Sequence, residues 1–233
     1  MRYTVSMVYR RTPFAEGEWY HCYSRGVDKR IVFDTERDYQ RFQQTLYLAN
    51  NVEDMQRDTS EQRKIAHADV FTLPRKAPIV AIAAYALLPN HFHLLLKEIT
   101  EGGITRFMRK LGTSYTMYFN IKNKRVGNLF LKPFRSKHVS SDQYFHVVPQ
   151  YIHLNAAEYF EADWKRGSVR DAKKLERELL KYAYCSLPDY YGSKRVEGEI
   201  VNKNEYYGTG DLPSLPDCIA DAVEYYAELE NQR

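Results

Sequence analysis

The sequence contains little cysteine and no long apolar run. Cys22, Cys185 and Cys218 are far apart and lack Cys-x-x-Cys spacing, which argues against a disulfide framework or a zinc knuckle and predicts reduced thiols. No apolar stretch approaches the roughly 20 residues of a membrane span, and residues 1–12 lack the apolar region of a signal peptide. With 44% apolar residues, the sequence predicts a globular, cytoplasmic protein with no membrane partner.

Acidic residues are absent from positions 102–141, although the whole chain holds 30 of them and has a formal net charge of only +4. A run of cations is often only a solvated surface, but aromatic residues such as Phe107, Phe119 and Phe134 are interleaved with this one. Cations bind phosphates and aromatic faces stack on unpaired bases, so the stretch predicts a nucleic-acid partner and a nucleoid-associated protein. The cations are Arg106, Arg109, Lys110, Lys122, Lys124, Arg125, Lys132, Arg135 and Lys137.

Two histidines, His91 and His93, interrupt the apolar run 87–96. Successive side chains of a strand point to opposite faces, so both imidazoles would lie on one face while Phe92 enters a core. Two imidazoles on a rigid strand can supply two ligands of a divalent metal ion. The alternative is a pair of core histidines, which would both need polar partners. The pattern alone does not decide between a metal or phosphate site and a pair of core histidines.

The hydrophobic periodicity predicts strands and helices in mixed order. An α+β fold with a ferredoxin-like antiparallel sheet, helices packed on it and the two histidines on a central strand accounts for that order. Pro133 favours an edge position or a bulge for its strand, and Pro149 should kink or restart its helix. The expected strands cover 18–23, 79–88, 91–97 and 129–139, and the expected helices cover 35–50, 104–121, 142–155, 171–182 and 215–229.

Changes in composition suggest how the chain is organised. Residues 1–17 show no clear periodicity and are interpreted as a lead-in, and residues 18–160 are predicted to form the main domain. Polar and charged residues at about 51–76 predict a surface insertion in that domain. Residues 161–233 are predicted to form a helical extension. Its acidic end is either a plain solvated helix or a cover for phosphate-binding cations.

The chain also contains four distinctive stretches in a particular order. They are Tyr20-His21-Cys22-Tyr23-Ser24-Arg25-Gly26, Leu88-Pro89-Asn90-His91-Phe92-His93-Leu94-Leu95, Met108-Arg109-Lys110-Leu111 leading to Tyr118-Phe119-Asn120, and Tyr151-Ile152-His153-Leu154-Asn155. Together they resemble the REP-associated tyrosine transposases, which belong to the single-tyrosine transposases of the HUH endonuclease class. The resemblance covers about residues 18–192, and the ordered set is far more specific than a histidine pair. It implies that 18–160 is the catalytic domain.

The resemblance implies an activity and a role for individual residues. The activity is that of a metal-dependent, transposase-like endonuclease and strand transferase that cleaves single-stranded DNA near hairpins of REP-type palindromes, through a 5′-phosphotyrosine intermediate. His91 and His93 match the metal ligands, Tyr151 matches the nucleophile, and Asn155 matches the polar residue that completes the metal site. Arg25 lies in a motif positioned for DNA. Nitrogen and oxygen ligands with open positions suit Mg²⁺ or Mn²⁺ as the cofactor.

The spacing of these residues is compatible with that chemistry. Tyr151 and Asn155 are four apart and would share one face of a helix. Because tyrosine is a weak nucleophile at neutral pH, a metal ion must polarise the phosphate. Tyr115 is the rival nucleophile, but Phe119 one turn later cannot bind a metal. His153 points away from the Tyr151 face and is interpreted as structural.

Two functions from different classes are open on the sequence alone. The first is the cleaving and rejoining enzyme, and the second is a non-catalytic module of the same fold that binds a DNA or RNA hairpin. The joint presence of His91, His93, Tyr151 and Asn155 favours the enzyme. The recognised hairpin, the preferred metal and the choice between monomer and homodimer stay open.

Overall fold

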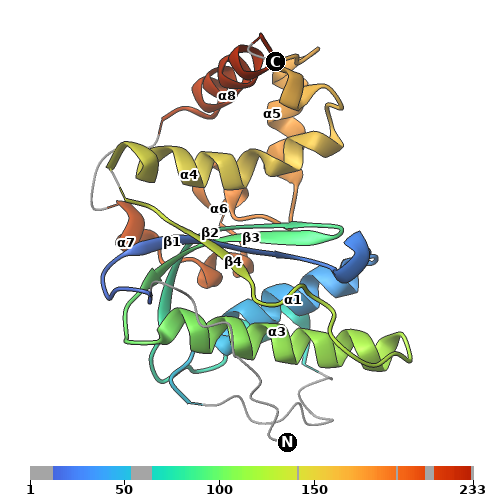
Figure 1. Cartoon of the computed structure of the whole chain (residues 1–233), viewed down its shortest axis with the longest axis vertical. Helices are drawn as coiled ribbons and strands as arrows, with labels where there is room; N and C mark the ends of the chain where they lie inside the picture. The colour runs from blue at the N-terminus through green and yellow to red at the C-terminus, as the bar shows by residue number, and fades with distance from the viewer. Residues whose placement is uncertain (1–12, 54–64, 141, 193, 208–212, 232–233) are drawn as a thin grey trace, which may run out of the picture.

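The centre of the molecule is a four-stranded antiparallel sheet flanked by helices, which confirms the predicted α+β class (Figure 1). The computed structural model describes residues 13–53, 65–140, 142–192, 194–207 and 213–231. Parts of the predicted lead-in and insertion lie outside these ranges. The strands are β1 (Trp19–Arg25), β2 (Val80–Leu88), β3 (His91–Glu98) and β4 (Arg135–His138). The α-helices are α1 (Glu36–Ala49), α2 (His67–Val70), α3 (Gly103–Lys122), α4 (Asp142–Leu154), α5 (Ala172–Lys181), α6 (Leu187–Tyr191), α7 (Lys203–Tyr207) and α8 (Leu215–Asn231).

The connectivity places β3 inside the sheet. The chain runs β1-α1-β2-β3-α3-β4 and the strands lie in the order β2-β3-β1-β4, which is the ferredoxin-like arrangement. β3 therefore pairs with a neighbour on each side. Short 3₁₀ helices complete the structure: η1 (Val27–Lys29), η3 (Asn155–Tyr159), η4 (Trp164–Arg166) and η5 (Val196–Ile200).

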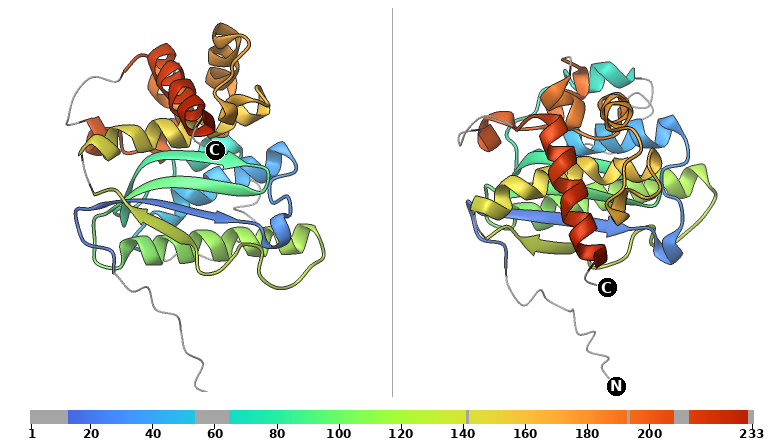
Figure 2. Two further views of the ribbon diagram at one scale, coloured as in Figure 1. Left: turned by 45° about the horizontal axis from the view of Figure 1, so that its top comes forward. Right: turned by 90° about the horizontal axis from the view of Figure 1, so that it is seen from above.

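Helices cover both faces of the sheet. α1 and α3 pack on one face, while α4, α5 and α8 lie over the other (Figures 1 and 2). Ile200 of η5 and Val201 belong to the core formed with α1 and α3. Alternation along β3 divides its side chains between these layers. Phe92, Leu94 and Leu96 enter the core formed with α1 and α3, whereas Leu95 belongs to the core beneath α4. Since His91 and His93 are in phase with Leu95, they lie on the α4 face.

The last strand is shorter than the sequence suggests. Only Arg135–His138 pair with β1, although an isolated bridge joins Phe130 to Gly26. The strand predicted over 129–139 was therefore too long. Pro133 lies just before β4, where it removes no donor from the ladder, and β4 occupies an edge as that proline indicated.

Pro149 was predicted to kink or restart its helix, and the helix does not restart there. α4 runs through Pro149, which lies within Asp142–Leu154, and changes to the 3₁₀ helix η3 only at Asn155. The tertiary packing explains this continuity, since Val148 and Ile152, on either side of the proline, are buried against the sheet. Packing of an apolar face outweighs the loss of one hydrogen bond at proline.

The C-terminal extension shares a core with the main domain. The backbone of Cys185 forms an isolated antiparallel β-bridge with Ala86 of β2, and the backbone N–H of Ser186 donates to the carbonyl of Tyr85. The apolar face of α8 packs over η4, with Ile219 buried in the same core as Trp164. The predicted boundary near residue 160 thus crosses a continuous hydrophobic cluster. No helix in the described ranges is long and apolar enough to cross a membrane.

Candidate active site

The α4 face of the sheet aligns polar side chains from neighbouring strands. In the pairing of β1 with β3, Arg25 lies opposite His91 and Tyr23 lies opposite His93. Directly opposed residues of an antiparallel pair share a face. The rings of His91 and His93 are 5.1 Å apart between centroids, and Tyr23 stacks on His93 at 5.5 Å. Strand pairing therefore brings both predicted metal ligands and one predicted DNA contact together.

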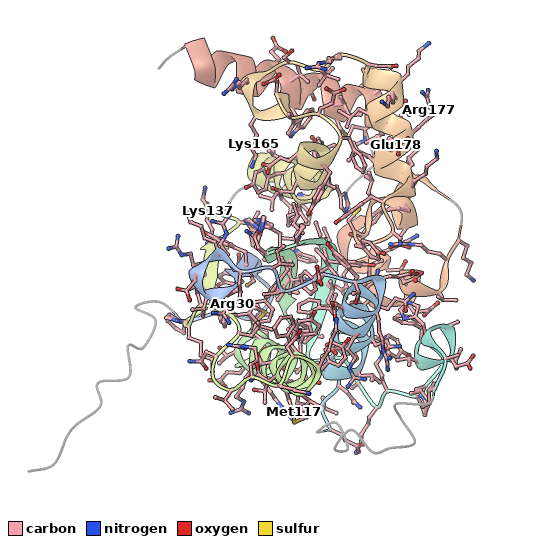
Figure 3. The ribbon with its side chains drawn as sticks, turned by 90° about the vertical axis from the view of Figure 1, so that its right-hand side faces the viewer. Arg30, Met117, Lys137, Lys165, Arg177 and Glu178 are labelled. Atoms are coloured by element: carbon pink, nitrogen blue, oxygen red, sulfur yellow. The ribbon has the colours of Figure 1, made fainter. Side chains whose placement is uncertain are left out.

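Four cations surround this group of rings. Arg25 comes from β1, and Arg135 and Lys137 come from β4, where they lie opposite Tyr23 and His21. The fourth is Lys165 of η4, which pairs with Glu158 and adds a smaller contribution to the lowering of the pKa of His91 and His93, which burial dominates. Figure 3 draws Lys137 and Lys165 on the same side of the molecule. Their positive potential favours a phosphate at this face.

His91 is held in one tautomer by its neighbour. Its Nδ1 lies 2.6 Å from Asn90 Oδ1, and Asn90 Nδ2 donates to the backbone carbonyl of Lys29 at 3.3 Å. That second bond orients the amide, because a carbonyl can only accept. His91 Nδ1 must then carry the proton that it donates to Asn90. The lone pair of His91 is left on Nε2.

His93 makes the matching contact with a third histidine. Its Nδ1 lies 2.8 Å from Nε2 of His21, and the two rings stack with centroids 5.0 Å apart. Both side chains are buried, each with 6% exposure. His21 is therefore part of the cluster, which it joins through the contact of its Nε2 with His93.

The three imidazoles are neutral at physiological pH. Burial lowers the pKa of His21 to about 4, and the ammonium of Lys137 contributes to the shift. Burial and the guanidinium of Arg25 lower the pKa of His91 to about 4, and burial holds the pKa of His93 well below its usual value. A neutral imidazole is the form that binds a metal ion.

The donor atoms of His91 and His93 fit a divalent metal ion. Each Nδ1 is occupied by a neighbour, and neither Nε2 has a hydrogen-bond partner in the described part of the chain. Ligating histidines in proteins characteristically bind the metal with one nitrogen and are oriented through the other. Among the described residues, no three histidine, cysteine, aspartate or glutamate side chains are placed to hold a metal ion together. A third protein ligand would therefore be a different group.

Asn155 is buried at the point where α4 becomes η3. Its Nδ2 donates to the backbone carbonyl of Tyr151 at 2.7 Å rather than to either histidine. This bond leaves the amide oxygen as the atom of Asn155 that is able to ligate a cation. The role predicted for Asn155 remains a prediction.

Tyr151 projects from α4 toward the histidines. Its ring meets His21 and His93 edge to face, with centroid distances of 5.8 and 5.9 Å. The residue retains 41% exposure, so a ligand can reach it from solvent. Two predicted groups, the histidine pair and the helical tyrosine, are thus adjacent.

Tyr115 and His153 occupy other environments. Tyr115 is fully buried on the α3 side of the sheet, where its hydroxyl donates to the carbonyl of Val32 at 2.6 Å and burial raises its pKa. His153 is buried and forms a 2.8 Å hydrogen bond with Ser186 Oγ. The rival tyrosine is therefore a core residue, and His153 has a structural partner, as the sequence indicated.

The remaining predicted cations do not share one surface with the histidines. Arg106, Arg109, Lys110 and Lys122 belong to α3, which lies across the sheet from α4 (Figures 1 and 3). Several of them have structural hydrogen bonds: Arg106 donates to the Val52 carbonyl, Lys110 to the carbonyls of Asn51 and Glu53, and Arg125 to Asn120 and Asn128. Lys124, Arg125 and Lys132 lie in the connection from α3 to β4. The nine cations of the 102–141 charge run therefore do not share one surface, because β4 and α3 contribute to opposite sides of the sheet.

Lys122 is a structural cation rather than a free one. Its Nζ lies 2.7 Å from both carboxylate oxygens of Asp38, which is fully buried and also accepts from Thr35 and Tyr118. Burial alone would raise the pKa of Asp38, but the hydrogen bonds from Lys122 and its neighbours lower it below the usual value.

Lys122→Met should therefore lower the free energy of unfolding at pH 7 by about 1–3 kcal/mol, because a buried carboxylate loses its cation. A depressed carboxyl pKa contributes stability above the unfolded pKa and loses it as the pH falls through the folded one, so the difference from wild type should shrink below about pH 4. Urea unfolding at several pH values measures both effects. Lys124→Met, the same change at an exposed neighbour, is the control. Equal stability of the two variants at pH 7 would contradict this role for Lys122.

Sequence reasoning missed three members of the site. His21 and Tyr23 alternate with Arg25 along β1, and this period of two is a signal that places all three on one face. Their proximity to the histidine pair depends on the β1–β3 register, which the pattern does not contain. No sequence pattern around Lys165 indicated that it belongs to the site, because it lies in η4 of the C-terminal extension, outside the strands that carry the other residues.

The sequence matches no protein-family model and no curated protein. Among solved structures, the chain is similar to a REP-associated tyrosine transposase bound to a REP hairpin. The two have 13% sequence identity and a TM-score of 0.48, over 89% of this chain and 93% of that chain.

Proposed function

We propose that this protein is a metal-dependent, single-stranded DNA endonuclease and strand transferase that forms a covalent link through Tyr151. The observation that carries the proposal is the position of Tyr151, an exposed helical tyrosine whose ring touches His21 and His93 on a face surrounded by cations. A merely structural histidine pair would not require a partly exposed tyrosine ring and several cations on the same face of the sheet. The ordered motifs that contain these residues support the same activity.

His91 and His93 would hold a divalent ion, Mg²⁺ or Mn²⁺, through their Nε2 atoms, and the amide oxygen of Asn155 is the candidate third ligand. When bound, such an ion polarises the phosphate and stabilises the charge that develops on its oxygens. Arg25, Lys137 and Lys165 contribute positive charge at the same face.

The reaction proposed for the chain is a transesterification at phosphorus. Tyr151 Oη attacks the phosphodiester, the new Oη–P bond forms, and the bond from phosphorus to the 3′ oxygen breaks. The DNA 5′ phosphate stays on Tyr151, the phenolic proton passes to solvent, and the leaving 3′ oxygen takes up a proton from solvent to become a hydroxyl. The numbers of phosphoester bonds before and after are equal, so the link can be reversed by a 3′ hydroxyl and strands can be rejoined.

A single strand beside a hairpin is the proposed substrate. The motif set from Tyr20 to Asn155 supports it by resemblance, and the cations of β1 and β4 on the same face of the sheet suit a flexible phosphate backbone that must approach closely. In the cell, such a substrate places the protein with the nucleoid in the cytoplasm. If the chain binds hairpins but neither cleaves DNA nor forms a covalent link, the alternative function, a non-catalytic hairpin-binding module, applies.

The proposal is tested by incubating the wild-type chain with end-labelled single-stranded oligonucleotides that carry palindromic hairpins, in the presence of Mn²⁺. A protein-linked label that survives denaturation, together with a released strand ending in a 3′ hydroxyl, is expected. Binding without any linked product, over a panel that includes palindromes flanking the coding region, would assign the chain to the binding-module class.

The salt dependence of hairpin binding distinguishes the two basic surfaces. Arg135→Ala with Lys137→Ala removes two cations from the histidine face, so the slope of log affinity against log salt should flatten by about 1.4, at roughly 0.7 per phosphate contact on single strands. Arg109→Ala with Lys124→Ala makes the same charge change on the α3 side and should leave the slope near that of wild type. Fluorescence anisotropy at several salt concentrations measures both. A flattening confined to the α3 pair would place the DNA on the other surface.

A further inference from the structure

The contact between His21 and His93 has two possible directions. Either His93 Nδ1 donates to His21 Nε2, or His21 Nε2 donates to His93 Nδ1, since a neutral imidazole carries one proton. In the second arrangement the proton of His93 would lie on Nε2 and no lone pair would face the site. Only the first arrangement allows His93 to bind a cation through Nε2.

We infer that His21 is a positioning residue that accepts the Nδ1 proton of His93 and thereby aims its Nε2 lone pair at the metal site. This inference rests on the proposed metal site and assigns a role to a residue outside the implied ligand set. Asn90 supplies the matching contact for His91, with an amide oxygen in place of an imidazole. Each ligand thus has its own orienting partner.

The strand register explains why a histidine can reach this position. Tyr23 lies directly opposite His93, which places His21 at the diagonal neighbour on the same face. Diagonal neighbours are within reach of aromatic side chains. The stacked rings of His21, Tyr23 and His93 hold the contact in place, with centroid distances between 5.0 and 5.5 Å.

Burial makes this contact consequential. His21 and His93 each have 6% exposure, so water cannot easily replace a lost partner. Without His21, the metal-bound form of His93 would hold an unpaired, buried N–H group, which is costly. Loss of the acceptor should therefore weaken metal binding by about 10- to 100-fold.

The experiment uses the full chain and Mn²⁺ alone, with binding followed by the electron paramagnetic resonance of free Mn²⁺. His21→Phe keeps a ring for stacking but removes the acceptor, and should weaken Mn²⁺ binding by about 10- to 100-fold. His21→Gln places an amide oxygen near the position of Nε2 and should restore affinity to within about threefold of wild type. His138→Phe, the same substitution at an exposed histidine on the other face of the sheet, should have no effect.

A second measurement does not depend on how the variants fold. Long-range ¹H–¹⁵N spectra of the wild-type chain with Zn²⁺ as a diamagnetic probe should show His93 protonated at Nδ1 and His21 without a proton at Nε2. A proton on His93 Nε2, equal Mn²⁺ affinity of His21→Phe and wild type, or no Mn²⁺ binding by wild type would each overturn the inference. A chain that binds Mn²⁺ through this arrangement yet links no DNA would contradict the proposed function alone.

Discussion

Tyr151→Phe is expected to abolish the covalent protein–DNA link while leaving hairpin binding within about twofold of wild type. The substitution removes only the hydroxyl, and the ring contacts with His21 and His93 stay in place. Phosphates and bases are held by cations and aromatic faces elsewhere, so affinity should survive. Loss of the attacking atom should lower the rate of linked product by at least about 1,000-fold. Denaturing gels of labelled hairpin with Mn²⁺ measure the link, and anisotropy measures affinity.

Tyr115→Phe is the matched control. It removes the hydroxyl that donates to the Val32 carbonyl in the core beneath α3, on the far side of the sheet. We expect normal cleavage and a loss of about 1 kcal/mol in the free energy of unfolding. If Tyr151→Phe still forms the link and Tyr115→Phe does not, the nucleophile has been assigned to the wrong tyrosine.

His91→Ala should lower the cleavage rate by at least about 100-fold, because it removes one of the two nitrogen ligands of the ion that polarises the phosphate. Hairpin binding should be retained. Removal of divalent ions from wild type with a chelator should have the same effect, and added Mn²⁺ should restore wild type fully but His91→Ala only slightly. Single-turnover cleavage across a Mn²⁺ titration measures both.

His138→Ala is the control for the loss of an imidazole. His138 pairs with Glu18 on the opposite face of the sheet from His91, so its removal should leave the Mn²⁺ dependence unchanged. Wild-type cleavage that continues at an unchanged rate after complete chelation would exclude a metal-dependent mechanism. The role of His91 would then be limited to contact with DNA.

Local pattern was sufficient to predict most of the elements. Alternation in 91–97 correctly separated the histidines from Phe92, and helical periodicity correctly located α1, α3, α5 and α8. Pro149 was expected to kink or restart its helix, and no restart occurs because burial of Val148 and Ile152 against the sheet stabilises α4 through the proline. Local propensity yields to packing where an apolar face is available.

The basic charge run does not form one surface, and the reason is again tertiary. Positions 102–141 are uniformly basic in sequence, but the chain crosses from α3 to β4 within them, and these elements contribute to opposite sides of the sheet. Cations that are consecutive in the sequence therefore lie on two different surfaces, one on the α3 side of the sheet and one on the α4 side. Lys122, in particular, pairs with a buried carboxylate that lies 84 residues away.

The sequence by itself determined the order of the four strands and the five longest helices, the placement of His91 and His93 on one face, and the four-residue spacing of Tyr151 and Asn155. Those features depend on periods of 2 and 3.6 residues, which neighbouring residues impose on each other. Only the tertiary structure decided that Tyr151 rather than Tyr115 lies beside the histidines, that His21 contacts His93, and that Lys165 adds to the positive charge. These relations depend on which strands pair, in which register, and on which face each helix packs, and such long-range choices minimise the free energy of the whole fold rather than of any one segment.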